Sequence, residues 1–81
     1  MELKDTIELM NSSDYKDRFK AEYYQLKNRY EKLHKMAIKM EAGTLDFEPT
    51  CNTELYDDQL YYMGNYLKVL EIRAEIEKIE L

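Results

Sequence analysis

Cysteine, histidine, proline, glycine and tryptophan are scarce in this chain of 81 residues. It contains one Cys, one His, one Pro, two Gly and no Trp. A single Cys excludes an intrachain disulfide, and one Cys with one His excludes a zinc site of the usual type within one chain. So few Gly and Pro argue against an all-β fold, which needs many tight turns. We therefore expect one small helical domain that spans residues 1–81.

Long hydrophobic runs are also missing. No apolar stretch approaches the ~18 residues of a membrane span, and the first residues lack the basic and apolar regions of a signal peptide. The lone Cys51 favours a reducing cytoplasm. The net charge of −5 disfavours binding to duplex DNA or to anionic membranes. The charge is uneven, since residues 14–42 carry +3 and residues 43–81 carry −6, which favours packing of these two segments against each other.

Apolar residues at helical spacing dominate the remainder of the sequence. In residues 14–42 they are spaced alternately by four and three: Phe19, Tyr23, Leu26, Tyr30, Leu33, Ala37 and Met40. Residues 54–81 repeat this spacing: Tyr56, Leu60, Met63, Leu67, Leu70 and Ala74. Such stripes are typical of coiled-coil-like packing. The pattern predicts an all-α antiparallel hairpin of two long helices, 14–42 and 54–81, joined by a connector at 43–53.

The ends of these helices carry recognisable capping residues. Ser13 and Thr53 are the expected N-caps, and Gly43 is expected to end the first long helix in the left-handed conformation. Residues 1–13 are expected to hold a short helix that packs through Leu3, Ile7 and Met10. In the connector, Leu45 and Phe47 are expected to fold back over the tip of the hairpin. Gly64 lies within the second helix, where it predicts a close helix crossing.

The second long helix carries a further apolar stripe: Tyr62, Tyr66, Val69, Ile72, Ile76 and Ile79. A chain this short rarely obtains more than ~3–5 kcal/mol from its own core. We therefore expect a homo-oligomer, most simply a two-fold dimer that forms a four-helix bundle. Its interface candidates are Tyr62, Tyr66, Val69, Ile72 and Ile76. The alternative is a monomer of three helices.

The eight Tyr residues are the most distinctive feature of the composition. Tyr offers a rigid ring and a hydroxyl group, and Lys or Arg nearby can meet a phosphate while the ring stacks on a base. The candidate ligand-binding residues are Tyr24, Lys27, Arg29, Tyr62, Tyr66 and Arg73. The alternative is that these rings serve oligomer packing. The acidic last third can also imitate phosphate charge and occupy a nucleic-acid-binding groove of another protein.

Motifs for catalysis and for metal binding are absent. There is no Gly-rich phosphate loop, no paired Cys and no His-Glu-x-x-His sequence. Cys51 and His34 lack a third residue to orient a nucleophile–base pair. Glu31 and His34 form a Glu-x-x-His sequence, which di-metal bundles use, but the stripe of the second helix offers no inward carboxylate. We expect no enzyme activity, no cofactor and no metal.

Several residue groups together resemble a known family. They are Lys16-Asp17-Arg18-Phe19, Glu22, Leu26, Tyr30-Glu31-Lys32-Leu33, Leu60, Met63, Tyr66-Leu67, Leu70 and Arg73-Ala74. Over about residues 15–76 the chain resembles small helical-hairpin proteins of bacteriophages, related to a short crAss-like-phage protein. The resemblance implies a phage or prophage source and action inside the host cell. It supplies no catalytic residues.

By analogy with other short phage proteins, the resemblance implies a non-enzymatic accessory protein that binds and neutralises a host anti-phage defence component. One version sequesters a cyclic nucleotide signal, as a nucleotide sponge. The other version inhibits a defence protein such as a CRISPR effector. The alternative is a structural or regulatory helical assembly protein without a role in defence, because a fold alone does not give a function.

Overall fold

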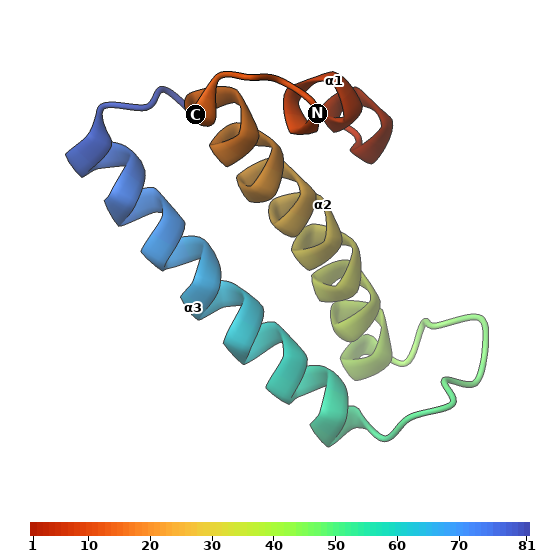
Figure 1. Cartoon of the computed structure of the whole chain (residues 1–81). Helices are drawn as coiled ribbons and strands as arrows, with labels where there is room; N and C mark the ends of the chain where they lie inside the picture. Colours follow the sequence, from red (N-terminus) through yellow and green to blue (C-terminus); the bar gives the residue numbers. More distant parts are fainter.

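The computed structural model describes residues 1–81 and contains helices without any strand. Helix α2 (Tyr15–Ala42) and helix α3 (Thr53–Glu77) form an antiparallel hairpin, as Figure 1 shows. The 3₁₀ helix η1 (Leu3–Thr6) and the short helix α1 (Ile7–Met10) precede it and pack on the first half of α2. The expected all-α fold is confirmed. None of the helices combines the length and apolar character that crossing a membrane requires.

Both long helices begin with a side-chain cap one residue away from the expected position. Asp14, not Ser13, caps α2, since its side chain accepts a hydrogen bond from the backbone N–H of Lys16 at 3.0 Å. Asn52 caps α3 by accepting from the N–H of Leu55 at 3.0 Å, and Thr53 is the first helical residue. Asp, Asn, Ser and Thr are all favoured N-cap residues, so the residue type alone does not decide which of two neighbours caps the helix.

The two helices end in the same way with different residues. Gly43 has a φ of 74° and ends α2, as its sequence position predicts. Helix α3 ends at Glu77, four residues before the expected boundary, because Lys78 adopts the left-handed conformation with a φ of 57°. The backbone N–H of Ile79 then donates to the carbonyl of Ala74 at 2.9 Å. This reversal turns Ile79 inward, where it is 6% exposed, so it belongs to the core and not to the outer stripe.

The N-terminal segment packs on α2 through a different face from the expected one. Thr6 is 1% exposed, whereas Ile7 and Met10 are 52% and 44% exposed. Because residues 3–6 form a 3₁₀ helix with three residues per turn, Leu3, Thr6 and Leu9 align on one side. The Thr6 hydroxyl donates to the carbonyl of Leu3 at 2.7 Å and accepts from Gln25 of α2 at 3.0 Å, which explains how a polar side chain tolerates burial.

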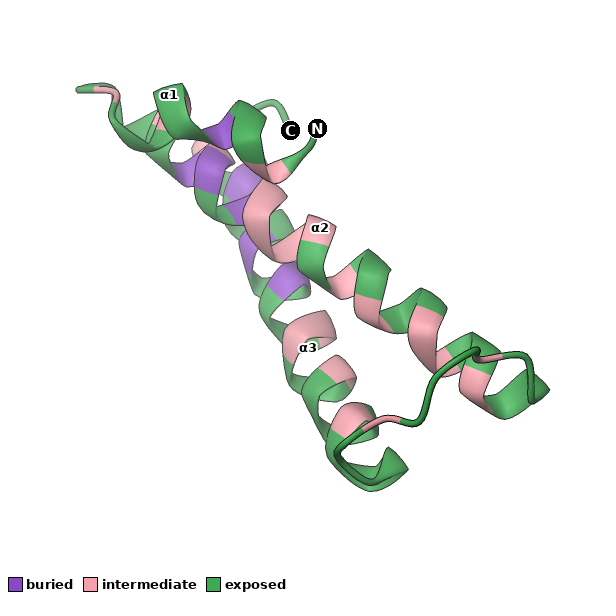
Figure 2. Cartoon of the chain, turned by 90° about the vertical axis from the view of Figure 1, so that its right-hand side faces the viewer, coloured by how far each residue is buried: buried purple, intermediate pink, exposed green.

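The core occupies one end of the hairpin. It consists of Phe19, Tyr23, Leu67, Leu70, Ala74 and Ile79, with Tyr24, Leu26 and Tyr30 partly buried against it. Figure 2 shows the buried residues gathered near α1, and α2 and α3 diverging away from them. Towards the connector, the expected stripe residues are only half-buried. The radius of gyration of 15.0 Å exceeds the ~12 Å of a compact chain of this length. We call these two parts the closed end and the open tip.

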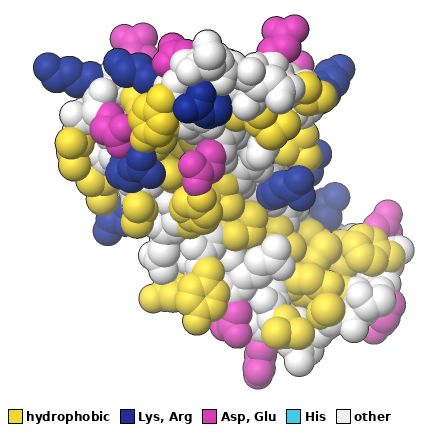
Figure 3. Space-filling view, viewed as in Figure 1, with side chains coloured by type: hydrophobic (Ala, Val, Ile, Leu, Met, Phe, Trp, Pro, Cys, Tyr) yellow, Lys and Arg dark blue, Asp and Glu magenta, His cyan; other side chains and the backbone are white.

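The connector leaves the tip uncovered. Leu45 is half-buried, but Phe47 is 55% exposed and does not fold back over the two helices. On the face seen in Figure 3, hydrophobic side chains gather over the tip, while Lys and Arg lie over the other half of the molecule. The open tip therefore presents apolar surface that the closed end hides.

Candidate functional site

A groove lies between α2 and α3 at the border of the closed end and the open tip. Its volume is about 280 Å³, and seven residues line it: Tyr23, Lys27, Tyr30, Glu31, Gly64, Leu67 and Glu71. The four residues from α2 share one helix face because they are spaced by four, three and one. The three residues from α3 are spaced by three and four and face them in the same way. The divergence of the two helices opens this space.

Tyr23 and Tyr30 give the groove aromatic walls, and Lys27 gives it a positive charge. The Lys27 ammonium lies 5.8 Å from the centroid of the Tyr23 ring, within the range of a cation–π interaction. The ring of Tyr30 stacks on His34, with centroids 6.0 Å apart and planes 12° apart. Opposite, a side-chain carbon at Gly64 would lie 3.6 Å from the Tyr30 ring, so the glycine leaves open one van der Waals layer of space. This is an ordinary contact distance to a side chain, so the close helix crossing expected at Gly64 stays a prediction.

A hydrogen bond closes the inner end of the groove. The Tyr23 hydroxyl donates to the Glu71 carboxylate at 2.8 Å. Burial, followed by this hydrogen bond, raises the pKa of Tyr23 to about 12. Tyr23 therefore keeps its proton, and its hydrogen bond to Glu71, to a higher pH than an ordinary tyrosine. Glu31 provides a second carboxylate in the groove lining.

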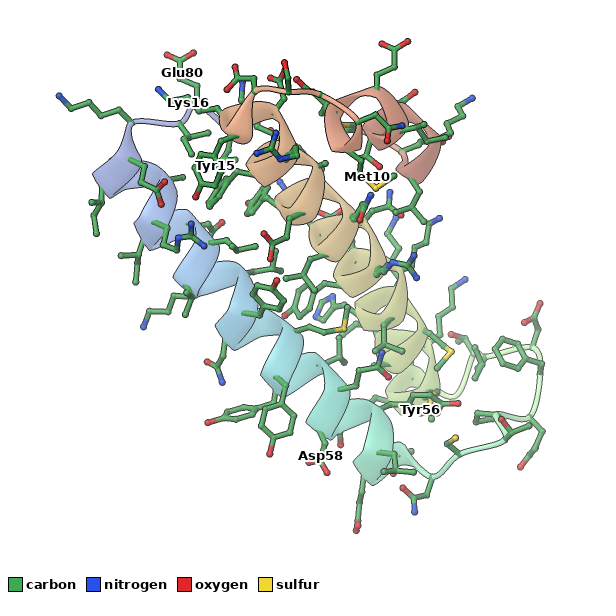
Figure 4. All side chains as sticks on the ribbon, viewed as in Figure 1. Met10, Tyr15, Lys16, Tyr56, Asp58 and Glu80 are labelled. Atoms are coloured by element: carbon green, nitrogen blue, oxygen red, sulfur yellow. The ribbon has the colours of Figure 1, made fainter.

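A smaller hollow of about 120 Å³ adjoins the groove through Lys27. Its other lining residues are Met1, Tyr24, Asn28 and Glu31. The Asn28 amide nitrogen donates to the carbonyl of Met1 at 3.3 Å, and its buried oxygen has no hydrogen-bond partner. A third hollow of about 180 Å³ lies at the open tip, where Tyr56 extends from α3 towards the end of α2 (Figure 4).

A polar cluster joins the two long helices near the termini. Tyr66 donates to Glu22, and Arg73 donates to the hydroxyl of Tyr15, which Figure 4 shows directed from α2 towards α3. Arg73 also pairs with Glu77 at 3.1 Å and lies over the ring of Phe19, 5.0 Å from its centroid. Hydrogen bonding with Glu77 is the main cause that raises the pKa of both Tyr15 and Arg73. This cluster links α2 and α3 on the surface beside the core.

The structure distributes the six predicted ligand residues over four places. Tyr24 and Lys27 line the same small hollow, and Lys27 also lines the groove. Tyr66 and Arg73 lie in the polar cluster, where their polar groups already have partners in the chain. Arg29 is exposed on α2, and Tyr62 is 70% exposed on the outer side of α3. The structure therefore does not bring the six residues into one site.

Six of the seven groove residues are missing from the predicted ligand-binding set, which contains only Lys27. Tyr23, Tyr30 and Leu67 belong to the apolar stripes, which predict packing between the helices. Glu31 belongs to the Glu-x-x-His sequence, Glu71 to the acidic last third of the chain, and Gly64 predicts a close helix crossing. The combination of a mid-helix Gly with a stripe Tyr on the partner helix is the pattern that indicates such a groove, but it requires the helix register, which one sequence does not supply.

The other residues considered for chemistry stay apart from the groove lining. Cys51 is exposed in the connector. His34 is exposed on α2 and stacks on Tyr30. No group of three or more His, Cys, Asp or Glu side chains is arranged so that it could hold a metal ion. The groove thus combines aromatic faces, one cation and two carboxylates, which is chemistry suited to noncovalent binding.

Comparison with known proteins identifies a family for this chain. No curated protein and no solved structure matches the chain. A family model described as Sequestin matches residues 13–76. This range includes α2, the connector and nearly all of α3, and it resembles the range of about 15–76 that carried the phage-protein resemblance. The link to a crAss-like-phage protein stays a prediction. The chain belongs to the Sequestin family.

Proposed function

We propose that this protein is a non-enzymatic phage accessory protein that sequesters a nucleotide signal of host defence in the groove between α2 and α3. The observation that carries the proposal is the arrangement of Tyr23, Lys27 and Tyr30 around the open space at Gly64. The family name Sequestin supports a sequestering role in general. Action in the host cytoplasm and a phage source belong to the same proposal.

Each part of the groove has a function in this proposal. A planar base packs against the tyrosine rings, which any base can do because every base has a π-face. The Lys27 ammonium meets a phosphate, and sugar hydroxyl groups donate to Glu31 and Glu71. Two carboxylates stand beside one lysine, and the whole chain carries a charge of −5. This balance favours ligands with few negative charges over polyphosphates.

Thermal unfolding in the presence of a panel of cyclic nucleotides tests the proposal. A ligand at 100 times its dissociation constant adds about 2.7 kcal/mol to the stability of the folded state. We expect at least one member of the panel to raise the melting temperature. Lys27→Ala and Tyr30→Ala should abolish this rise. Arg29→Ala removes a neighbouring cation outside the groove and should leave the rise in melting temperature unchanged. The absence of a shift across the panel, or equal loss in the Arg29 variant, contradicts the proposal.

A second version of the function has the protein inhibit a defence protein such as a CRISPR effector. The acidic composition of residues 43–81 supports it, because a negative helix can compete with nucleic acid for a basic groove. Stoichiometric binding to a purified effector that added DNA displaces would support this version. The alternative without a role in defence is a helical assembly protein, which the exposed apolar side of α3 favours.

A further inference from the structure

Helix α3 carries an apolar stripe on the side that faces away from α2. Leu55, Tyr62, Val69 and Ile76 recur every seven residues and are 55%, 70%, 53% and 74% exposed. Ile72 lies beside them and is 49% exposed. The spacing keeps these side chains on one side of the helix over a length of about 32 Å. We call these five residues the outer stripe. Nothing in the chain covers it.

The exposed area of the chain is larger than that of a folded monomer of the same mass. The accessible surface is 6164 Å², whereas a folded monomer of this mass exposes about 5,200 Å². The excess of about 1,000 Å² resembles the ~800 Å² that each partner contributes to a standard protein interface. This excess belongs to the whole chain, including the open tip, and it is large enough to include one interface of standard size.

We propose that the outer stripe is the interface of a two-fold homodimer in which α3 packs lengthwise and antiparallel on α3 of a second copy. A straight stripe with a seven-residue repeat matches the shape of an identical stripe, and a two-fold axis between Asn65 and Tyr66 overlaps the two over their whole length. Leu55 then lies opposite Ile76 of the second copy, and Tyr62 lies opposite Val69 of the second copy. Such self-complementarity is what a two-fold interface requires.

The charges beside the stripe select the antiparallel orientation. When Leu55, Tyr62, Val69 and Ile76 are placed at heptad position a, Asp58 falls at position d, which also faces the second helix. Lys68 and Arg73 then fall at the flanking positions g and e. A parallel pair would place Asp58 against Asp58 of the second copy, and Lys68 against Arg73 of the second copy. Like charges so close together are destabilising. The antiparallel pair moves Asp58 and its copy to opposite ends of the interface.

The dimer leaves the groove free, so this inference does not rest on the proposed function. Gly64, Leu67 and Glu71 line the groove and face α2 on the opposite side of α3 from the outer stripe. Tyr66 and Arg73 lie at the edge of the stripe, where α2 already supplies their partners Glu22 and Tyr15. Each dimer thus presents two separate grooves.

The mass of the protein in solution tests the dimer. Light scattering over a range of micromolar concentrations should give about twice the chain mass of 9.8 kDa. Val69→Asp should halve that mass and keep the helical circular dichroism. Ile38→Asp is the matched control, because Ile38 is 52% exposed on α2, outside the stripe. A monomeric natural protein, a dimeric Val69 variant, or equal dissociation of the Ile38 variant overturns the proposal.

Engineered cysteines test the orientation. In a Cys51→Ser background, Asn65→Cys lies beside the proposed axis and should form a disulfide with its own copy under mild oxidation. Ile76→Cys alone should stay unlinked, and a mixture with Leu55→Cys should give the mixed disulfide. Self-linking of the Ile76 variant without the mixed product would show a parallel pair and overturn the antiparallel arrangement.

Discussion

The closed end and the open tip of the hairpin carry the same apolar repeat but differ in burial. At the closed end, Phe19 and Leu70 are 2% and 1% exposed, whereas Leu33 and Leu60 near the tip remain half-exposed. The closed end has a third layer, because η1 and α1 cover α2 and Ile79 folds back onto the core. The tip has two diverging helices and an exposed connector (Figure 2). A two-helix stripe therefore becomes a core only where a third segment covers it.

The largest expected difference between the two regions concerns leucine truncation. Leu70→Ala removes a fully buried side chain and should lower the free energy of unfolding by about 2–5 kcal/mol. Leu33→Ala in the half-exposed stripe should lower it by about 1 kcal/mol. Urea denaturation at one fixed protein concentration measures both values. Equal losses would show that the tip closes in solution.

The hydroxyl of Tyr23 makes the stability of the folded chain depend on pH in the alkaline range. Its pKa is about 12 in the folded chain, mainly through burial, against the usual 10.0. The unfolded chain therefore loses this proton first. The stabilisation is complete below pH 10 and disappears as the pH rises towards 12, with a total on the order of 2 kcal/mol.

The variant Tyr23→Phe isolates this effect from the titration of other tyrosines and lysines. It should lose about 1 kcal/mol at neutral pH with the hydrogen bond to Glu71. Between pH 10 and pH 12 its stability should fall less steeply than that of the natural chain. Parallel curves for the two proteins, measured by urea denaturation at each pH, would contradict the role assigned to Tyr23.

The smallest expected effect lies at the border of the two regions and has the opposite sign. Gly64→Ala should raise the free energy of unfolding by about 1 kcal/mol, because alanine favours helix and its methyl group meets Tyr30 at an ordinary 3.6 Å. The same methyl group narrows the groove and should weaken ligand binding. A stabilised variant with full binding would place the ligand elsewhere.

The sequence allowed the two helices and their facing stripes to be predicted, because period and caps are local properties. It did not allow the divergence at the tip to be predicted, since a heptad repeat at Leu33 or Leu60 specifies which side faces the partner and not how closely. The positive φ of Lys78 could not be predicted from the sequence, because a lysine rarely adopts this conformation. This one residue places Ile79 in the core instead of on the outer side of α3.

The candidate site was harder to predict than the fold. The charge of Lys27 predicts ligand binding, and Lys27 lines the groove. The ring of Tyr62 predicts the same, but Tyr62 is 70% exposed on the side of α3 that faces away from α2. The groove depends on pairs such as Tyr30 with Gly64, and such pairs follow from the register between two helices that are distant in sequence.

The position of the core at the closed end also has a consequence for how the chain folds. A hairpin with its core beside the connector could form contacts between near neighbours first. In this chain Phe19 packs in one cluster with Leu70, so about fifty residues must close into a loop before the main burial is gained. Contacts between distant residues slow folding. The helices α2 and α3 are thus expected to form early and separately, and to meet at their outer ends before the tip.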